Sequence, residues 1–299
     1  MSKSIEDRLE RIPVISQLVA FLKGIKFSFL EGYSLYDLVE LYVVGIVRGA
    51  FSYRAGSIAF SFFMALFPFA LFILNLIPYI PVDNFQADFM QFVADSVPPT
   101  TFDAVESTLA DIMSNSYKSL LSSGFLLSIF LMTNGVFAII GGFESSYHIT
   151  ISRNIVRQYL VALVLSVLLA FLLIFSVAVY VGLEVLMFKF EIDNTLIQWS
   201  RSVFLLLIVL LTTSILYKFG AKETMKVSFI SIGSVFTTIL YILTSFLFGV
   251  YVLRFARYNE LYGSIGTLLV VMFYLWINCM ILLLGFELNL AISKLKSKK

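Results

Sequence analysis

The sequence predicts an all-α, polytopic membrane protein: six transmembrane helices, with extra amphipathic helices at the N-terminus and in the first outer connection. Two observations carry this prediction. Of the 299 residues, 60% are hydrophobic and 13% are charged, whereas soluble domains average about 45–50% apolar and about 25% charged residues. The chain also contains six apolar stretches of roughly the 20 residues that a helix needs to cross the hydrocarbon core. This composition argues against a soluble enzyme.

The expected organisation has three parts. A membrane domain of residues 55–292 holds spans at 55–80, 119–140, 158–183, 202–219, 227–252 and 264–292. Residues 1–54 are expected to form cytoplasmic amphipathic or interfacial helices, and residues 293–299 a basic cytoplasmic tail. Residues 81–118, between the first two spans, are expected to form a helical lid on the outer face, because two apolar stripes flank Pro98 and Pro99 and acidic residues occupy the other side.

The N-terminal segment carries two helical patterns. Apolar residues from Val14 to Phe29 fall on one stripe, with Lys23 and Lys26 away from it. A second helix is expected to begin at Ser34, with Asp37 completing a capping box. Two interpretations remain open for these helices: they pack on the cytoplasmic side of the bundle, or they lie on the lipid surface.

The distribution of basic residues predicts the orientation. Basic residues near the ends of spans remain cytoplasmic. With the N-terminus inside, 16 of the 21 Lys and Arg residues fall in cytoplasmic segments and five fall outside. We therefore expect both termini in the cytoplasm.

Residues that support common enzymatic chemistry are scarce. Cys279 and His148 are the single cysteine and the single histidine, so an intramolecular disulfide and a multi-cysteine metal site are excluded. No phosphate-binding loop and no metalloprotease or serine-hydrolase motif occurs. The basic residues are not interleaved with aromatic residues in the manner of nucleic-acid sites. We expect no catalytic residue, no metal, no cofactor and no nucleic-acid partner.

Inside the expected spans the polar residues are neutral. Asn75, Asn134 and Asn278 are predicted to line a polar path, although amides in membranes also serve simply to join helices. Pro68 lies in the middle of the first span, where it removes a backbone hydrogen bond and is expected to kink or break the helix. Such a break serves either packing or a transport cavity.

Glu287 is expected near the inner end of the last span. It is either solvated at the interface or part of an ion pair with a cytoplasmic arginine. The predicted inner clasp joins Glu287 to Arg54 or Arg153, with Arg157 as a further partner to consider.

Several short segments resemble the YihY/virulence factor BrkB family of bacterial inner-membrane proteins. They are Leu66-Phe67-Pro68, Val97-Pro98-Pro99, Gly142 to Tyr147 with Arg153 downstream, and two segments at the ends of the last span. Those two segments hold the most specific residues of the motif: Tyr262, Gly263 and Gly266 at one end, and Gly285, Glu287 and Asn289 at the other. The chain departs from the family pattern at Phe286, where a small residue is usual, and at Tyr241, where a Trp is frequent.

The resemblance implies a six-span protein of the bacterial inner membrane with uncertain biochemistry. The label ribonuclease BN is attached to the family by naming history, and members are linked to serum resistance and to the traffic of envelope lipids. Three hypotheses follow. The first is non-enzymatic transport or flipping of a lipid-like envelope molecule, with membrane lipids as partners; the second is a scaffold that recruits envelope machinery; the third is a membrane enzyme.

Overall fold

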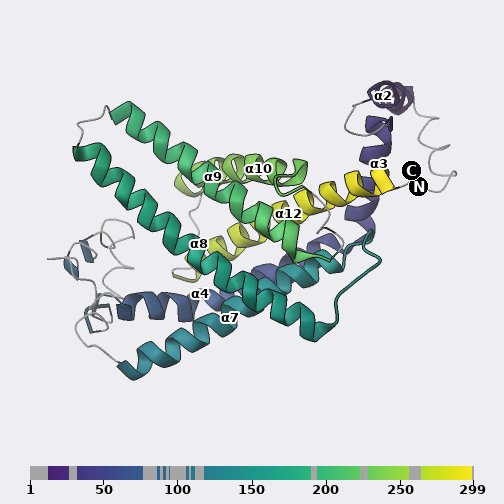
Figure 1. Cartoon of the computed structure of the whole chain (residues 1–299). Coiled ribbons are helices and arrows are strands. Elements are labelled where there is room, and N and C mark those ends of the chain that lie inside the picture. Colours follow the sequence, from purple (N-terminus) through teal and green to yellow (C-terminus); the bar gives the residue numbers. More distant parts are fainter. Residues whose placement is uncertain are drawn as a thin grey trace.

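A computed structural model of the chain describes residues 13–26, 32–76, 86–87, 90–91, 94, 106–107, 109–111, 118–189, 194–222, 224, 228–255 and 264–297. Within these residues the secondary structure is helical, apart from one isolated bridge between Lys26 and Ser34. The principal helices (Figure 1) are α2 (Pro13–Gly24), α3 (Leu35–Arg48), α4 (Phe51–Leu76), α7 (Lys118–Glu144), α8 (Ile155–Lys189), α9 (Asn194–Gly220), α10 (Ile232–Phe255) and α12 (Ser264–Ser297).

The described helices confirm the expected fold class, an all-α polytopic bundle. Five of them are long and apolar enough to cross a membrane: α7, α8, α9, α10 and α12. A sixth span results when α3 and the first part of α4 are counted together, since they form a pair bent by 62°.

The bend between α3 and α4 lies at Gly49 and Ala50, where Ala50 takes a φ of +47°. Of the kink or break expected at Pro68, the break is absent, since α4 continues as a helix through Pro68 to Leu76. A proline removes only one hydrogen bond from the ladder, and the hydroxyl of Ser128 on α7 donates to the Pro68 carbonyl at 3.0 Å. This contact ties the middle of α4 to α7.

The capping residues explain where two helices begin. At the start of α3 the Ser34 side chain accepts from the Asp37 backbone, and the Asp37 carboxylate accepts from the Ser34 backbone N–H at 2.8 Å, as the sequence predicts. Helix α10 begins at Ile232, five residues after the expected start of that span. Ser231 and Ser234 exchange backbone-to-hydroxyl hydrogen bonds of 3.0 and 3.1 Å, which fixes the start there. The outer lid expected at residues 81–118 lies largely outside the described residues.

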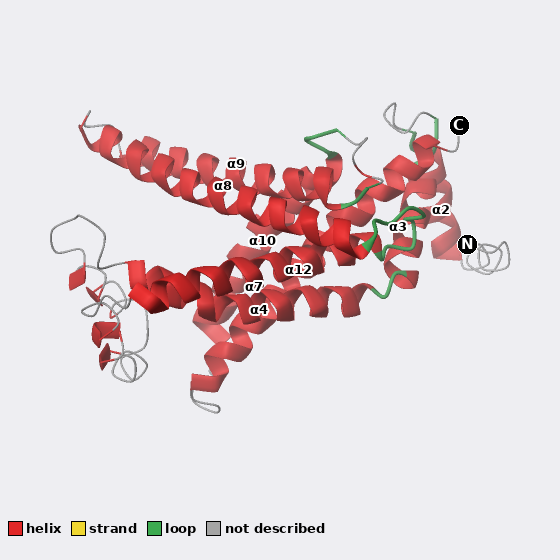
Figure 2. Cartoon of the chain, turned by 60° about the horizontal axis from the view of Figure 1, so that its bottom comes forward, coloured by secondary structure: helices red, strands yellow, loops and turns green. Residues whose placement is uncertain are grey.

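Two hairpins, the helix α10 and the central helix α12 form the bundle. Figures 1 and 2 both show the α4–α7 and α8–α9 hairpins meeting at the end that carries α3 and separating toward the opposite end. Helix α12 packs against α3, α4, α7 and α10. We call the meeting region the α3 end; it comprises α3, the start of α4, α8 and α10, and the last turns of α7, α9 and α12.

The apolar core lies near the α3 end. Phe143 on α7 stacks on Phe286 on α12 with ring centroids 4.0 Å apart, and Tyr217 on α9 contacts both rings. In contrast, α8 exposes large apolar side chains such as Phe171 and Ile174 along its outer side. Exposed apolar faces on long helices are typical of lipid-facing surfaces.

Candidate functional site

A buried ion pair lies at the α3 end of the bundle. Arg54, in the first turn of α4, and Glu287, near the C-terminal end of α12, approach to 2.7 Å between Nη2 and Oε1. The two side chains are only 4% and 0% exposed. Along the sequence these two residues are more than 200 positions apart, so the ion pair joins the start and the end of the membrane domain.

Further hydrogen bonds surround this pair. The second carboxylate oxygen of Glu287 accepts from the Ser146 hydroxyl at 2.9 Å, and Arg54 Nη1 donates to the Gly142 carbonyl at 2.8 Å. The Arg54 Nε–H is buried and has no partner among the described residues. The pair therefore binds α4 and α12 to the end of α7 and to the loop that follows it.

Gly45 on α3 lies directly against Glu287 and His148, and the absence of a side chain at this position makes the close approach possible. A Cβ at this position would lie 2.7 Å from Glu287 Oε2 and 2.9 Å from His148 Nε2. The His148 ring nitrogen Nε2 lies 2.8 Å from the Leu41 carbonyl of α3, and because a carbonyl only accepts, this nitrogen carries the proton. We call Gly45, Arg54, Ser146, His148 and Glu287 the polar cluster.

The polar cluster includes residues that the sequence analysis did not select. Ser146 lies within the family segment Gly142 to Tyr147, and His148 follows it, but in this loop neither has a periodicity that marks it as buried. Gly45 and Gly49 are four residues apart on one helix face, a spacing that permits close helix contacts. That spacing was the available signal, and it did not identify which side chains approach Gly45.

Arg153 is not part of the clasp with Glu287, contrary to one of the predicted pairings. It binds Glu144 instead, through Nη1 at 3.0 Å and through its backbone N–H at 3.0 Å. The same guanidinium donates to the carbonyls of Gly220 and Phe219, the last residues of α9. A cation at a helix C-terminus satisfies carbonyls that lack helical partners, so Arg153 fastens α9 to α7. Arg157 lies exposed at the start of α8.

The motif near the end of α12 forms a close joint with α10. Asn289 accepts from the Gly233 backbone N–H at 2.8 Å and donates to the Ser231 hydroxyl at 2.8 Å, so it satisfies the start of α10. A Cβ at Gly285 would overlap Thr237 Oγ1 and lie 2.7 Å from the Gly233 carbonyl. Glycine is therefore required where these two backbones meet. At the other end of α12, Gly266 is buried, while Tyr262 and Gly263 lie outside the described residues.

Two of the three expected lining asparagines have described side chains, and these two do not share one path. Asn278 lines an apolar cavity inside the bundle and donates to the Tyr274 carbonyl of its own helix at 2.7 Å. Asn134 lines a separate polar pocket between α4 and α7. Asn75 lies on α4, but its side chain is outside the described part of the chain. The two placed amides thus face different spaces, because α4 and α7 separate them.

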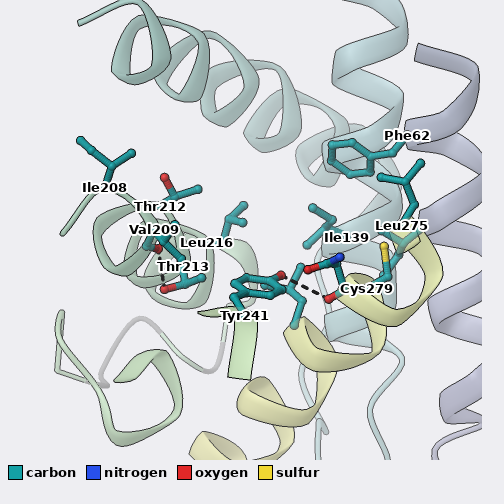
Figure 3. Close-up of a pocket in the computed structure, with 13 residues that line it drawn as sticks. Phe62, Ile139, Ile208, Val209, Thr212, Thr213, Leu216, Tyr241, Leu275 and Cys279 are labelled. Carbon is teal, nitrogen blue, oxygen red and sulfur yellow. Dashed lines mark hydrogen bonds between the residues drawn. The ribbon is translucent and has the colours of Figure 1, made fainter. Parts of the chain in front are cut away.

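The apolar cavity has a volume of about 310 Å³ and lies among α4, α7, α9, α10 and α12. Figure 3 shows side chains of α9 on one side of the cavity and those of α4 and α12 on the other, with Tyr241 at its base. The Tyr241 hydroxyl donates to the Asn278 carbonyl at 3.2 Å, so that polar group is satisfied. None of the thirteen lining residues is charged, and Thr212, Thr213, Tyr241 and Asn278 supply the polar atoms.

No group of three or more His, Cys, Asp or Glu side chains within the described residues could hold a metal ion. Two ion pairs, Arg54–Glu287 and Arg153–Glu144, lie at the α3 end. The arrangement combines these buried pairs with an uncharged cavity among the long apolar helices.

Comparison with known proteins places the chain in a family. The model of the Virulence factor BrkB family matches residues 45–299. The chain belongs to this family of membrane proteins, and its several apolar helices make it a multi-pass membrane protein.

Individual relatives are similar over most of their length. YfkH of Bacillus subtilis, whose name describes it only as ribonuclease-like, is 29% identical over 81% of this chain and 90% of its own. A UPF0761 membrane protein of Coxiella burnetii is 22% identical over 78% of this chain and 85% of its own. Another, from Aliivibrio fischeri, is 22% identical over 83% and 81%. No solved structure matches the chain.

Proposed function

We propose that this protein is a non-enzymatic transporter that moves or flips a lipid-like, amphipathic envelope molecule across the bacterial inner membrane. The observation that carries the proposal is the apolar cavity of about 310 Å³ within the membrane-spanning helices. Its volume falls at the lower end of the range of about 300–1,000 Å³ that small-molecule pockets cover.

The character of the lining favours a hydrocarbon occupant. An ion or a sugar phosphate in the hydrocarbon region needs a counter-charge, because an unpaired charge there costs several kcal/mol. The cavity offers no charge and a few hydroxyls. An acyl chain requires no counter-charge, and the hydroxyls of Thr212 and Tyr241 tolerate the polar part of such a molecule.

The polar cluster provides the closure at one end. With Arg54 and Glu287 paired and almost fully buried, the α3 end is held together by α3, α4, α7 and α12. The concentration of basic residues in this half of the molecule supports its assignment to the cytoplasmic side. In the proposed mechanism, the cavity opens toward the end of the bundle opposite the α3 end.

Transport is tested with the full chain in proteoliposomes that carry a fluorescent phospholipid in both leaflets. A membrane-impermeant reductant bleaches the outer leaflet, and a loss of fluorescence beyond one half reports flipping. We expect the wild-type protein to accelerate this loss over protein-free vesicles. Thr212→Trp fills the cavity and is expected to bring the rate down to that of protein-free vesicles.

The matched control is Leu207→Trp, which places the same indole on an outward-facing position of the same helix, where the leucine is 53% exposed. Both variants are compared by size-exclusion chromatography to confirm that they fold. Wild-type vesicles without flipping activity, or equal rates for Thr212→Trp and Leu207→Trp, would contradict the proposal.

A further inference from the structure

A second cavity, unlike the first, is polar. It lies between α4 and α7, has a volume of about 390 Å³, and is walled by hydroxyl, amide, aromatic and very small side chains. We call it the polar pocket; its polar residues are Tyr53, Arg54, Ser57, Ser61, Asn134 and Ser145. Small residues at Ala138, Gly141 and Gly142 leave the space open between the two helices.

The polar pocket extends from the α3 end toward the middle of the membrane. On α7 its wall runs from Ser145, just past the helix end, back to Asn134. Asn134 and Ser145 are eleven positions apart, and at about 1.5 Å per residue this separation corresponds to roughly 16 Å along the helix. The pocket thus brings polar groups to a depth at which the surrounding medium is hydrocarbon.

The polar groups of this pocket differ in burial. Tyr53, Ser57 and Ser145 are exposed, and Asn134 is half-buried. Ser61 donates to the Ser57 carbonyl at 3.0 Å. In the same wall, the Arg54 Nε–H is buried and unpaired among the described residues. A buried N–H without a partner is costly in a membrane protein, so this donor, with the half-buried amide of Asn134 beside it, favours a polar occupant.

The charge of the pocket indicates which occupant. Arg54 is its single charged residue, and Glu287 already neutralises that charge at 2.7 Å. A headgroup with several phosphates therefore meets no net positive charge there. Hydroxyl groups, in contrast, both donate and accept, as serine, tyrosine and asparagine side chains require. Tyr53 and Phe137 add aromatic surface beside these polar groups.

We propose that the polar pocket is the headgroup site of the transported lipid, and that it selects an uncharged, hydroxyl-rich headgroup such as a glycosyl group. This inference rests on the proposed function and names the substrate class. The headgroup enters between α4 and α7 at the α3 end while the tails remain in the surrounding lipid.

The apolar cavity and the polar pocket lie on different faces of α4. Ile58 and Phe62 face the cavity, whereas Ser57 and Ser61 face the pocket. Residues one apart on a helix are separated by about 100°, so one molecule does not occupy both spaces in this conformation. The pocket is consequently a recognition site, and the cavity accepts the apolar part at a later step.

The test compares two fluorescent lipids with identical tails, monoglucosyl-diacylglycerol and phosphatidylglycerol. The full chain is reconstituted in nanodiscs for binding by native mass spectrometry and in proteoliposomes for flipping. We expect preferential binding and faster flipping of the glycolipid. Asn134→Leu removes one polar partner from the pocket and is expected to weaken glycolipid binding about fivefold, as loss of one hydrogen bond predicts.

Asn154→Leu is the matched control, since it makes the same substitution at an exposed position that lines neither cavity, and it is expected to retain the glycolipid preference. Equal binding of both lipids, or glycolipid binding that is unchanged in Asn134→Leu, overturns the headgroup assignment. If the wild-type protein still flips lipid in that case, the proposed transport function stands. Glycolipid binding that Asn134→Leu weakens, without any flipping, supports the pocket and contradicts transport. Failure of Asn134→Leu to fold is recognised by size exclusion, and Ser57→Val then replaces it in the same comparison.

Discussion

The Arg54–Glu287 pair allows the strongest test of how the bundle is held together. At an effective dielectric constant of about 20, two unit charges 2.7 Å apart attract by about 6 kcal/mol. Desolvation of both side chains offsets much of this attraction, so the intact pair contributes little net stability. Removal of one partner is different, because the other charge then remains buried without compensation, at a cost of about 3–5 kcal/mol.

We therefore expect Glu287→Gln and Arg54→Met each to lower the free energy of unfolding by about 3–5 kcal/mol. The double variant leaves no buried charge and is expected to recover most of that loss. Unfolding by sodium dodecyl sulfate in mixed micelles, followed through tryptophan fluorescence, measures all three. Lys296→Met, which removes an exposed charge from the same helix as Glu287, is the control and is expected to change stability by less than about 1 kcal/mol.

Two results would refute this reasoning. If each single variant lost less than about 1 kcal/mol, the pair would not be desolvated as the structure describes. If the double variant lost as much as the two single variants together, the charges would contribute independently, and their coupling across α4 and α12 would be absent.

Three further predictions concern the other joints and the cavity. Gly285→Ala should destabilise the protein by about 1–3 kcal/mol in the same unfolding assay, because its methyl group meets Thr237, whereas Gly249→Ala, with open space around it, should be neutral or slightly stabilising. Asn289→Leu removes two buried hydrogen bonds at the start of α10 and should cost about 1–3 kcal/mol; an unchanged unfolding curve would show that water replaces the amide. Cys279, the single thiol, lines the apolar cavity, so a small membrane-soluble thiol reagent should label it in membranes faster than a charged reagent of equal reactivity. Equal labelling by both reagents would indicate a water-filled space.

The sequence predicted the parts of the fold that depend on one helix at a time. Apolar length predicted the five helices that are long enough to span a membrane on their own, and the Ser34–Asp37 pattern predicted the start of α3, because hydropathy and capping are local properties. The sequence analysis placed the start of α10 too early because it did not recognise the Ser231–Ser234 pair as a helix cap. A serine pair is a weaker capping signal than a serine followed by an acidic residue.

The candidate site depends on how helices are rotated and how deeply they sit, which hydropathy does not determine. The sequence offered three arginines for Glu287, and only the packing of α4 on α12 brings Arg54 to it. In the same way, Asn134 and Asn278 were equivalent as polar residues in apolar spans, yet α4 and α7 place them in different spaces. Proline at position 68 suggested a break, but α4 continues as a helix through it.

The separation of Arg54 and Glu287 along the chain has a consequence for biosynthesis. At about 5–20 residues per second, the 233 residues between them correspond to a delay of roughly ten to fifty seconds. During this interval the first span is in place while its arginine has no carboxylate partner. Ser146 and His148, which belong to the polar cluster, precede Glu287 by more than one hundred residues. The last span therefore completes the ion pair, and a chain that stops before α12 has no Glu287 to neutralise Arg54.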